Sequence, residues 1–287
     1  MKTLFTLLFL GFLSPIFSQE DAGSFYLHFL HPNFSNPSIQ LSDSLITVNS
    51  NLIWKDEPRG YSSIYGGGQI PNRNLKSNLG FNLFTSDDGT HYLREAGLNY
   101  NWVILSAEKI RIMTGGEIGV RSQRYFRPRS ASTTTFPQEI DKKWNSTLLN
   151  GGISIIWKSF MVGFSCRNCV STGVDLEDIN SDDLTHRKLY LSGSFKREIN
   201  EQWLLRVDAV ARNFNYYQLA DITVSSVFFN KFHLGGSWRD EFPVNWAVHG
   251  GFKCKNYFFY GVFQPKNRRH GSAIELAAQL EFHHLKK

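Results

Sequence analysis

The strongest constraint on the fold is a period-two alternation of side chains that recurs along most of the chain. It is clearest between Lys109 and Arg121, where apolar residues alternate with charged residues and glycines. Period two places successive side chains on opposite faces of a β-strand. One face consists of Ile110, Ile112, Thr114, Gly116, Ile118 and Val120, and the other of Arg111, Met113, Gly115, Glu117, Gly119 and Arg121.

The residues that share a face distinguish between two classes of β-protein. A soluble β-sandwich also alternates, but its polar face meets bulk water and rarely carries repeated glycines. Here charges and glycines occupy the same face, as on the inner wall of a barrel whose outer wall meets lipid. The segment therefore predicts a strand of a transmembrane β-barrel.

Comparable segments recur between Ser44 and Phe282, and we count about fourteen, an even number as in bacterial outer-membrane barrels. The connections alternate in length: Lys158-Ser159 is very short, whereas Ser122 to Ser146 and Asn168 to Arg187 are long. Gln69 to Leu75 is expected to be a turn at the end of the barrel that carries the short connections, although it is rather long for that set. Short turns are periplasmic in such barrels and long loops are extracellular. We predict an all-β, antiparallel up-and-down barrel in residues 44–287.

Aromatic residues support this fold. They make up 15% of the chain, with 24 Phe, 11 Tyr and 7 Trp. Amphipathic aromatic rings gather at the two membrane–water interfaces of outer-membrane barrels. Five tryptophans near segment ends are expected to lie in these girdles: Trp54, Trp102, Trp157, Trp203 and Trp238.

The N-terminus predicts export. Lys2 is followed by an apolar run from Leu4 to Leu13 and then by small or polar residues at Ser14, Pro15 and Ser18. This order is typical of a secretory signal peptide, and the run is shorter than the roughly twenty residues of a spanning helix. We therefore expect residues 1–18 to be a cleaved signal peptide. Residues 19–43 are expected to meet periplasmic partners or partly fill the barrel.

Motifs for catalysis or cofactor binding are missing from the sequence. It has neither a Gly-x-Ser-x-Gly elbow nor a His-Glu-x-x-His motif, and Gly66 to Gly68 lacks the lysine of a phosphate loop. The acidic stretch Asp175 to Asp183 could bind calcium, or it is a solvated loop. Cys166 and Cys169 either form a local disulfide or stay reduced, and with Cys254 the odd count leaves at least one cysteine free. We predict a protein that is not an enzyme and holds no cofactor.

The formal charge of +6 includes no concentrated basic block beyond Lys266 to Arg269. A mildly basic surface beside acidic lipid headgroups explains it better than nucleic-acid binding, which we do not expect.

Several motifs, in this order, resemble the PorP/SprF family of Bacteroidota outer-membrane proteins, associated with type IX secretion and gliding. The first is the aromatic stretch that ends at the pair Asn36-Pro37, where the family usually continues with small residues and this chain has Ser38-Ile39-Gln40. The resemblance covers roughly residues 25 to 195. The other matching stretches are residues 78–89, 96–100, 114–120 and 150–165, of which the last is the closest match.

The resemblance implies a non-enzymatic barrel that retains or presents type IX-secreted surface proteins such as adhesins. It also implies contact with periplasmic or lipoprotein components of the secretion and gliding machinery. The main alternative function is that of an outer-membrane porin or small-molecule transporter. Two further alternatives are a membrane-embedded hydrolase and a soluble β-sandwich. Candidate partner-binding residues, chosen for residue types that interfaces favour or for the Asn-Pro pair, are Arg121, Arg124, Tyr125, Phe126, Arg127, Phe136, Trp144, Asn36 and Pro37.

Overall fold

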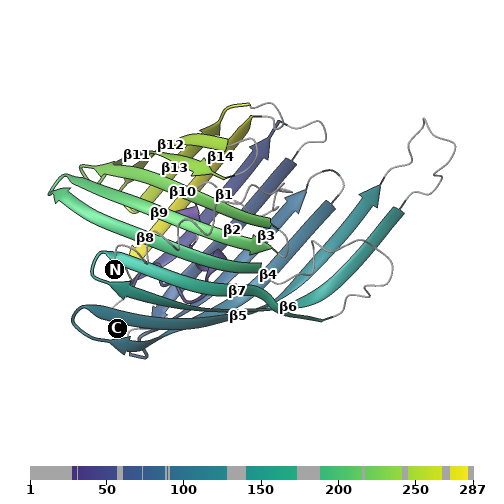
Figure 1. The fold of residues 1–287 in the computed structure, drawn as a ribbon, viewed down its shortest axis with the longest axis horizontal. Coiled ribbons are helices and arrows are strands. Elements are labelled where there is room, and N and C mark those ends of the chain that lie inside the picture. Colours follow the sequence, from purple (N-terminus) through teal and green to yellow (C-terminus); the bar gives the residue numbers. More distant parts are fainter. Residues whose placement is uncertain are drawn as a thin grey trace.

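Fourteen antiparallel strands close into one barrel in the described part of the computed structural model (Figure 1). The described residues are 28–30, 32–56, 61–72, 74–87, 89, 91–127, 140–172, 188–214, 217–240, 245–266 and 272–283. Two short helical turns, η1 (His28–Leu30) and α2 (Pro32–Ser35), precede the strands. The strands are β1 (Leu45–Lys55), β2 (Tyr61–Asn72), β3 (Ser77–Asp87), β4 (His91–Ser106), β5 (Ile110–Arg127), β6 (Ile140–Trp157), β7 (Phe160–Thr172), β8 (Lys188–Asn200), β9 (Trp203–Phe214), β10 (Tyr217–Phe228), β11 (Phe232–Arg239), β12 (Asn245–Cys254), β13 (Tyr257–Gln264) and β14 (Ala273–His283).

The first and last strands close the sheet. β1 pairs with β14 along its whole length, from Leu45 opposite His283 to Lys55 opposite Ala273. Every other strand pairs with its two neighbours in sequence, which is the up-and-down order. The predicted fold class is confirmed.

The two faces of the strands have the predicted chemistry. On β5, Ile118 and Val120 are 65% and 61% exposed, whereas Glu117 and Arg121 are 4% exposed. The same alternation holds on β1, where Asn49 and Asn51 are buried and Leu52 is exposed. Exposed apolar side chains cover the outside of the barrel as a lipid-facing surface, and polar side chains line the lumen.

The five tryptophans predicted for the girdles all point outward and are partly or largely exposed. Trp54 and Trp238 lie near the end of the barrel that carries the long connections, and Trp102, Trp157 and Trp203 lie near the end with the short turns. The aromatics therefore mark both membrane–water interfaces.

The predicted bounds of three connections are wrong. β2 continues through Asn72, so the turn to β3 begins later than Gln69. β5 continues to Arg127 and β6 begins at Ile140, inside the loop expected from Ser122 to Ser146. β7 likewise reaches Thr172. Strand pairing extends past the lipid, where both faces of a strand meet water and the polar–apolar alternation is no longer required.

No helix in the described ranges is long and apolar enough to cross a membrane. The expected signal peptide, residues 1–18, and the acidic stretch 175–183 lie outside the described residues.

The outward face of β6 offers a test of the lipid-facing surface. Ile153 is central in the apolar outward row of this strand, and Asn145 is exposed on the same face beyond the row. Ile153→Lys is expected to cost about 2–4 kcal/mol of folding free energy in lipid, and Asn145→Lys about 0–1 kcal/mol. Urea titration of the heat-modifiable gel shift in vesicles measures both. Equal losses for the two variants would contradict the placement of the membrane.

Candidate functional site

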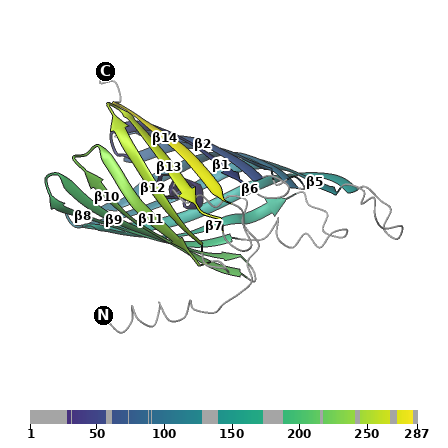
Figure 2. The ribbon, with the colours of Figure 1, turned by 90° about the horizontal axis from the view of Figure 1, so that it is seen from above.

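The lumen holds the stretch of chain that precedes β1, which we call the inner segment (residues 28–30 and 32–44). It begins beside the last strands, where Leu30 packs against Ala247, Val262 and Ala277 of β12, β13 and β14. It then passes to the opposite wall, where Ser38 Oγ donates a hydrogen bond to Ser154 Oγ of β6 at 3.0 Å. The inner segment therefore crosses the interior of the barrel, and Figure 2 shows it in purple behind β13 and β14.

Glycines on three adjacent strands make room for the inner segment. A Cβ atom at Gly115 of β5 would lie 2.4 Å from the Pro37 carbonyl oxygen, and one at Gly152 of β6 would lie 2.1 Å from Asn36 Oδ1. Gly163 of β7 faces Asn36 at a similarly short distance. At Gly115 only a residue without a side chain permits so close an approach of the Pro37 backbone, whereas Gly152 and Gly163 face the Asn36 side-chain amide. These three inward glycines leave the space in the lumen that Asn36 and Pro37 occupy.

Aromatic and cation–π contacts hold the middle of the inner segment. The Phe34 ring lies 5.2 Å from the Tyr65 ring in an edge-to-face arrangement and 5.4 Å from the Phe84 ring. The guanidinium of Arg167 lies 3.9 Å from the Phe34 ring centroid. Such contacts are worth about 0.5–2 kcal/mol each, more where water is excluded.

Polar contacts fix the end of the inner segment that leads into β1. Gln69 Nε2 donates to the Ile39 carbonyl at 3.0 Å, and the Leu41 N–H donates to Gln69 Oε1 at 2.9 Å. Arg111 Nη1 forms an ion pair with Asp43 Oδ2 at 2.6 Å. Strands on several sides of the lumen thus hold the inner segment.

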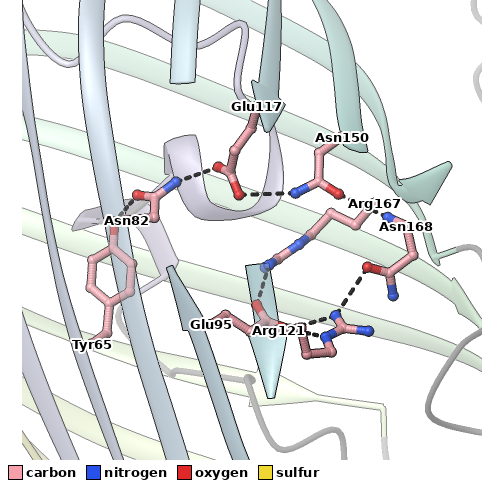
Figure 3. Close-up of polar contacts among 8 residues, drawn as sticks. All are labelled: Tyr65, Asn82, Glu95, Glu117, Arg121, Asn150, Arg167 and Asn168. Atoms are coloured by element: carbon pink, nitrogen blue, oxygen red, sulfur yellow. Dashed lines mark hydrogen bonds and ion pairs between the residues drawn. The ribbon is translucent and has the colours of Figure 1, made fainter. Parts of the chain in front are cut away.

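A buried polar network lies beside the inner segment on β2 to β7 (Figure 3). Its first half is centred on Glu117, which accepts hydrogen bonds from Asn82 Nδ2 at 2.5 Å and Asn150 Nδ2 at 2.9 Å. The Tyr65 hydroxyl donates to Asn82 Oδ1 at 2.7 Å, and Asn33 Nδ2 of the inner segment donates to the same oxygen at 3.2 Å. The network therefore joins the barrel wall to α2.

The second half of the network is ionic. Glu95 accepts from Arg121 Nε at 2.7 Å and from Arg167 Nη2 at 2.6 Å. Arg121 Nη2 also donates to Asn168 Oδ1 at 3.0 Å, and the Asn168 N–H donates to Asn150 Oδ1 at 2.8 Å. The two guanidiniums balance the formal charges of the two carboxylates, and buried charges require such pairing.

A second ionic group lines the opposite wall of the lumen. Asp221 of β10 forms ion pairs with Arg212 of β9 and with Arg239 of β11, the latter at 2.8 Å. Arg206 and Asp208, both on β9, form a pair at 2.6 Å. Each carboxylate is paired with at least one guanidinium, and the hydrogen bonds of Asp221 tie β9, β10 and β11 together.

Groups for metal or redox chemistry are not assembled in the described residues. They contain no set of three or more His, Cys, Asp or Glu side chains placed to hold a metal ion. None of Cys166, Cys169 and Cys254 forms a disulfide, so of the two possibilities for Cys166 and Cys169 the structure has the reduced thiols.

The outer end of β5 and β6 forms a hairpin that projects farther than the neighbouring strands (Figures 1 and 2). Its register runs from Arg121 opposite Ser146 to Arg127 opposite Ile140. Arg124 on this hairpin forms a two-point ion pair with Asp141, with Nε and Nη2 distances of 2.8 and 2.7 Å, and both side chains are about half exposed.

The structure places the candidate partner-binding residues in two different environments. Arg121, Asn36 and Pro37 are buried in the lumen, whereas Arg124 is exposed on the hairpin and Trp144 on the hairpin is half-buried. Tyr125, Phe126 and Arg127 belong to β5, but their side chains lie outside the described part, as does Phe136 altogether. The structure therefore does not bring these nine residues into one surface.

Sequence reasoning missed the asparagines that join the members of the polar network in the lumen. Asn82 and Asn150 bridge charged and neutral members of the network, and Asn33 attaches the inner segment to it. A signal was present, because asparagine recurs at inward positions of the alternating segments. Amide side chains both donate and accept, which suits a polar wall without net charge.

Three solved structures share the fold of this chain at low sequence identity. The Pseudomonas putida toluene transporter TodX has a TM-score of 0.54 and 9% identity over 93% of this chain and 99% of its own. The Ralstonia pickettii toluene transporter TbuX has a TM-score of 0.55 and 9% identity, over 87% and 93%. A Pseudomonas aeruginosa FadL homologue has a TM-score of 0.51 and 12% identity, over 87% and 93%.

No curated protein sequence matches the chain. The sequence profile of the family described as "Type IX secretion system membrane protein PorP/SprF" matches residues 18–264. That range includes the inner segment and thirteen of the fourteen strands, from β1 to β13. The profile match and the closed barrel agree, so this chain belongs to the PorP/SprF family of type IX secretion system membrane proteins.

Proposed function

We propose that this protein is a non-enzymatic outer-membrane barrel that binds type IX-secreted, adhesin-like proteins and anchors or presents them at the cell surface. Its periplasmic end associates with components of the secretion and gliding machinery. The single observation that supports this most is the barrel of a secretion-system family whose lumen is occupied by its own inner segment. A barrel occupied in this way is suited to carrying binding surfaces at its two ends.

The two ends differ in the surface that they offer. The end with short turns, such as Lys158-Ser159 and Lys255-Asn256, exposes little chain beyond the membrane. The other end carries the projecting hairpin of β5 and β6, with exposed charges such as Arg124. Since short turns are periplasmic in outer-membrane barrels, the projecting hairpin is extracellular. We assign client binding to the hairpin end.

Transport of small molecules is the second candidate function. It is favoured by the likeness to TodX and TbuX, which are described as toluene transporters. At 9% identity this likeness concerns the fold, and one fold supports many functions. Contact of the inner segment with opposite walls of the lumen, at Leu30 and at Ser38, favours anchoring over transport.

Co-purification tests the proposed function. The tagged full-length protein is extracted in mild detergent from the outer membrane of its own cells, and bound proteins are quantified by mass spectrometry. In one variant a short Gly-Ser linker replaces residues 128–139; in the matched control Asn-Gly replaces Lys255-Asn256. The first variant is expected to lose secreted surface proteins and retain machinery components, and the control to retain the surface proteins. If no secreted surface protein co-purifies with the wild type, anchoring is refuted.

Conductance distinguishes anchoring from transport. Gly115→Ala is expected to displace the Pro37 backbone, which would otherwise lie 2.4 Å from the new Cβ, and so to raise single-channel conductance in planar bilayers. Gly116→Ala is the matched control, because its nearest neighbour is 3.6 Å away on the outer face. The wild type and the control are expected to stay closed. A wild type that conducts as freely as an open porin would favour transport.

A further inference from the structure

We propose that the outward face of β3 to β6 binds a phosphate-bearing lipid of the outer leaflet, the lipid A part of lipopolysaccharide. Arg94 and Lys143 hold its phosphate, and an apolar groove beside Arg94 holds its acyl chains. The inference goes beyond the proposed function and shares with it only the placement of the long connections on the extracellular side.

Strand register arranges the outward side chains of β3 to β6 in rows at successive depths. Toward the end with the long connections, the rows are Phe81, Leu98, Ile118 and Leu149, then Leu83, Ala96, Val120 and Thr147, and then Thr85, Arg94, Ser122 and Asn145. The first row is apolar, the second is mostly apolar and the third is polar. This change of chemistry places Arg94 at the boundary between acyl chains and headgroups.

An apolar groove lies on the outward face next to Arg94. It has a volume of about 990 Å³, and Arg94 is one of the residues that line it. Small and apolar outward side chains form most of its lining, among them Ser50, Ile64, Gly66, Leu83, Ala96 and Val120. At Gly66 the groove is open, because a Cβ atom there would meet no atom within 4 Å. The groove therefore offers apolar surface to an acyl chain that lies along the barrel.

Two cations near the groove have no carboxylate partner among the described residues. Arg94 and Lys143 are both exposed. Arg94 donates through Nε to the Tyr92 hydroxyl, and its guanidinium lies 4.6 Å from the Tyr92 ring centroid. The terminal nitrogens of Arg94 remain for a ligand, and guanidinium and ammonium groups are the common protein ligands of phosphate.

The two cations are close enough to serve one headgroup. Arg94 lies opposite Ser122, Ser122 lies opposite Asn145, and Lys143 is two residues from Asn145 on the same face. Their backbones are thus about 10 Å apart across the strands and about 7 Å apart along them. Two long side chains can span this separation around a phosphate.

The acidic residues of this face are engaged elsewhere. Asp141 forms its ion pair with Arg124 at 2.7 Å. Asp87 lies opposite Tyr92, and its Oδ1 accepts a hydrogen bond from the Gly89 N–H at 2.8 Å. The positive charge of Arg94 and Lys143 is therefore left to an external anion.

Other strands present tryptophan at this end of the barrel. Trp54 of β1, Trp238 of β11 and Trp246 of β12 point outward and are between 37% and 55% exposed. Aromatic rings suit membrane interfaces in general, whereas clustered basic side chains recognise phosphate headgroups. The β3–β6 side of the rim is thus equipped to select a lipid by its charge.

The leaflet and the charge together identify the lipid class. The long connections place Arg94 in the outer leaflet, where lipopolysaccharide is the principal lipid of Gram-negative outer membranes. Its lipid A part combines phosphate with several acyl chains, which match the two cations and the groove. A second copy of the same face would instead bring like charges together.

Substitution of the two cations tests the phosphate half of the site. Full-length protein in detergent is titrated with lipid A, and the occupied fraction is measured by native mass spectrometry. Arg94→Gln with Lys143→Gln is expected to weaken binding at least about tenfold, because two charge-assisted contacts are lost. Lys109→Gln with Lys231→Gln removes two exposed charges at the opposite end and is expected to change binding less than about twofold. Equal weakening in the two double variants, with the heat-modifiable fold intact, would overturn the proposal.

Two further ligands distinguish the lipid from a free anion. Dephosphorylated lipid A is expected to bind the wild type at least about tenfold more weakly than lipid A does, and to lose nothing more in the Arg94 and Lys143 double variant. Inorganic phosphate in excess is expected not to displace lipid A, since it lacks acyl chains. Displacement by phosphate alone would assign these cations to a free anion and refute the lipid site.

A matched pair of glycine substitutions tests the acyl half. Gly66→Leu fills the groove and is expected to weaken lipid A binding about fivefold or more. Gly151→Leu is the control, because a Cβ atom there also meets no atom within 4 Å and Gly151 does not line the groove. Unchanged binding in Gly66→Leu would contradict the groove, as would a photo-cross-linker at position 96 that captures a second copy of the chain in place of lipid.

Discussion

The structure depends on the absence of water inside the bilayer, because every backbone N–H and C=O group that crosses the lipid must find a partner in the protein. Closure of β1 on β14, from Leu45 opposite His283 to Lys55 opposite Ala273, supplies that partner for the two strands that would otherwise be edges. Closure also decides the sequence pattern, since each strand then has one face toward lipid and one toward the lumen.

Closure with fourteen strands creates a second requirement, which concerns the inside. Side chains fill the interior of an eight-stranded barrel, whereas barrels of sixteen to eighteen strands leave an aqueous channel. In this chain the lumen receives the inner segment, and the wall is adapted to it by glycines such as Gly115 and by amides such as Gln69. Buried charges remain acceptable because they are paired or hydrogen-bonded, as Glu95 is with Arg121 and Arg167 and Glu117 is with Asn82 and Asn150. The inner segment and the polar wall are therefore mutually dependent.

The part of the fold that lipid dictates could be predicted from the sequence. The alternation on β5 correctly assigned Ile118 to the outside and Glu117 to the inside, and the count of alternating segments gave the number of strands. The projecting ends of β5 and β6 were expected to be loop, because in water neither face of a strand must be apolar. The specific partners in the lumen network were also beyond prediction, since Asn82, Glu117 and Asn150 meet only once strand register is fixed. Arg121 lies inside the barrel, as its place on the same face as Glu117 predicted, although it was also chosen as a candidate partner-binding residue.

The fold likeness to toluene transporters and the membership in a secretion family are compatible for the same physical reason. A bilayer imposes closure, strand length and an apolar outer face on every barrel of this kind, so chains at 9% identity converge on one architecture. Differences in function must then reside where the bilayer imposes nothing. In this chain those places are the inner segment and the projecting hairpin of β5 and β6, and both depart from simple period-two patterning. Because the inner segment crosses the lumen and a hairpin projects from one rim, contact with other molecules is concentrated at the ends of the barrel (Figure 1).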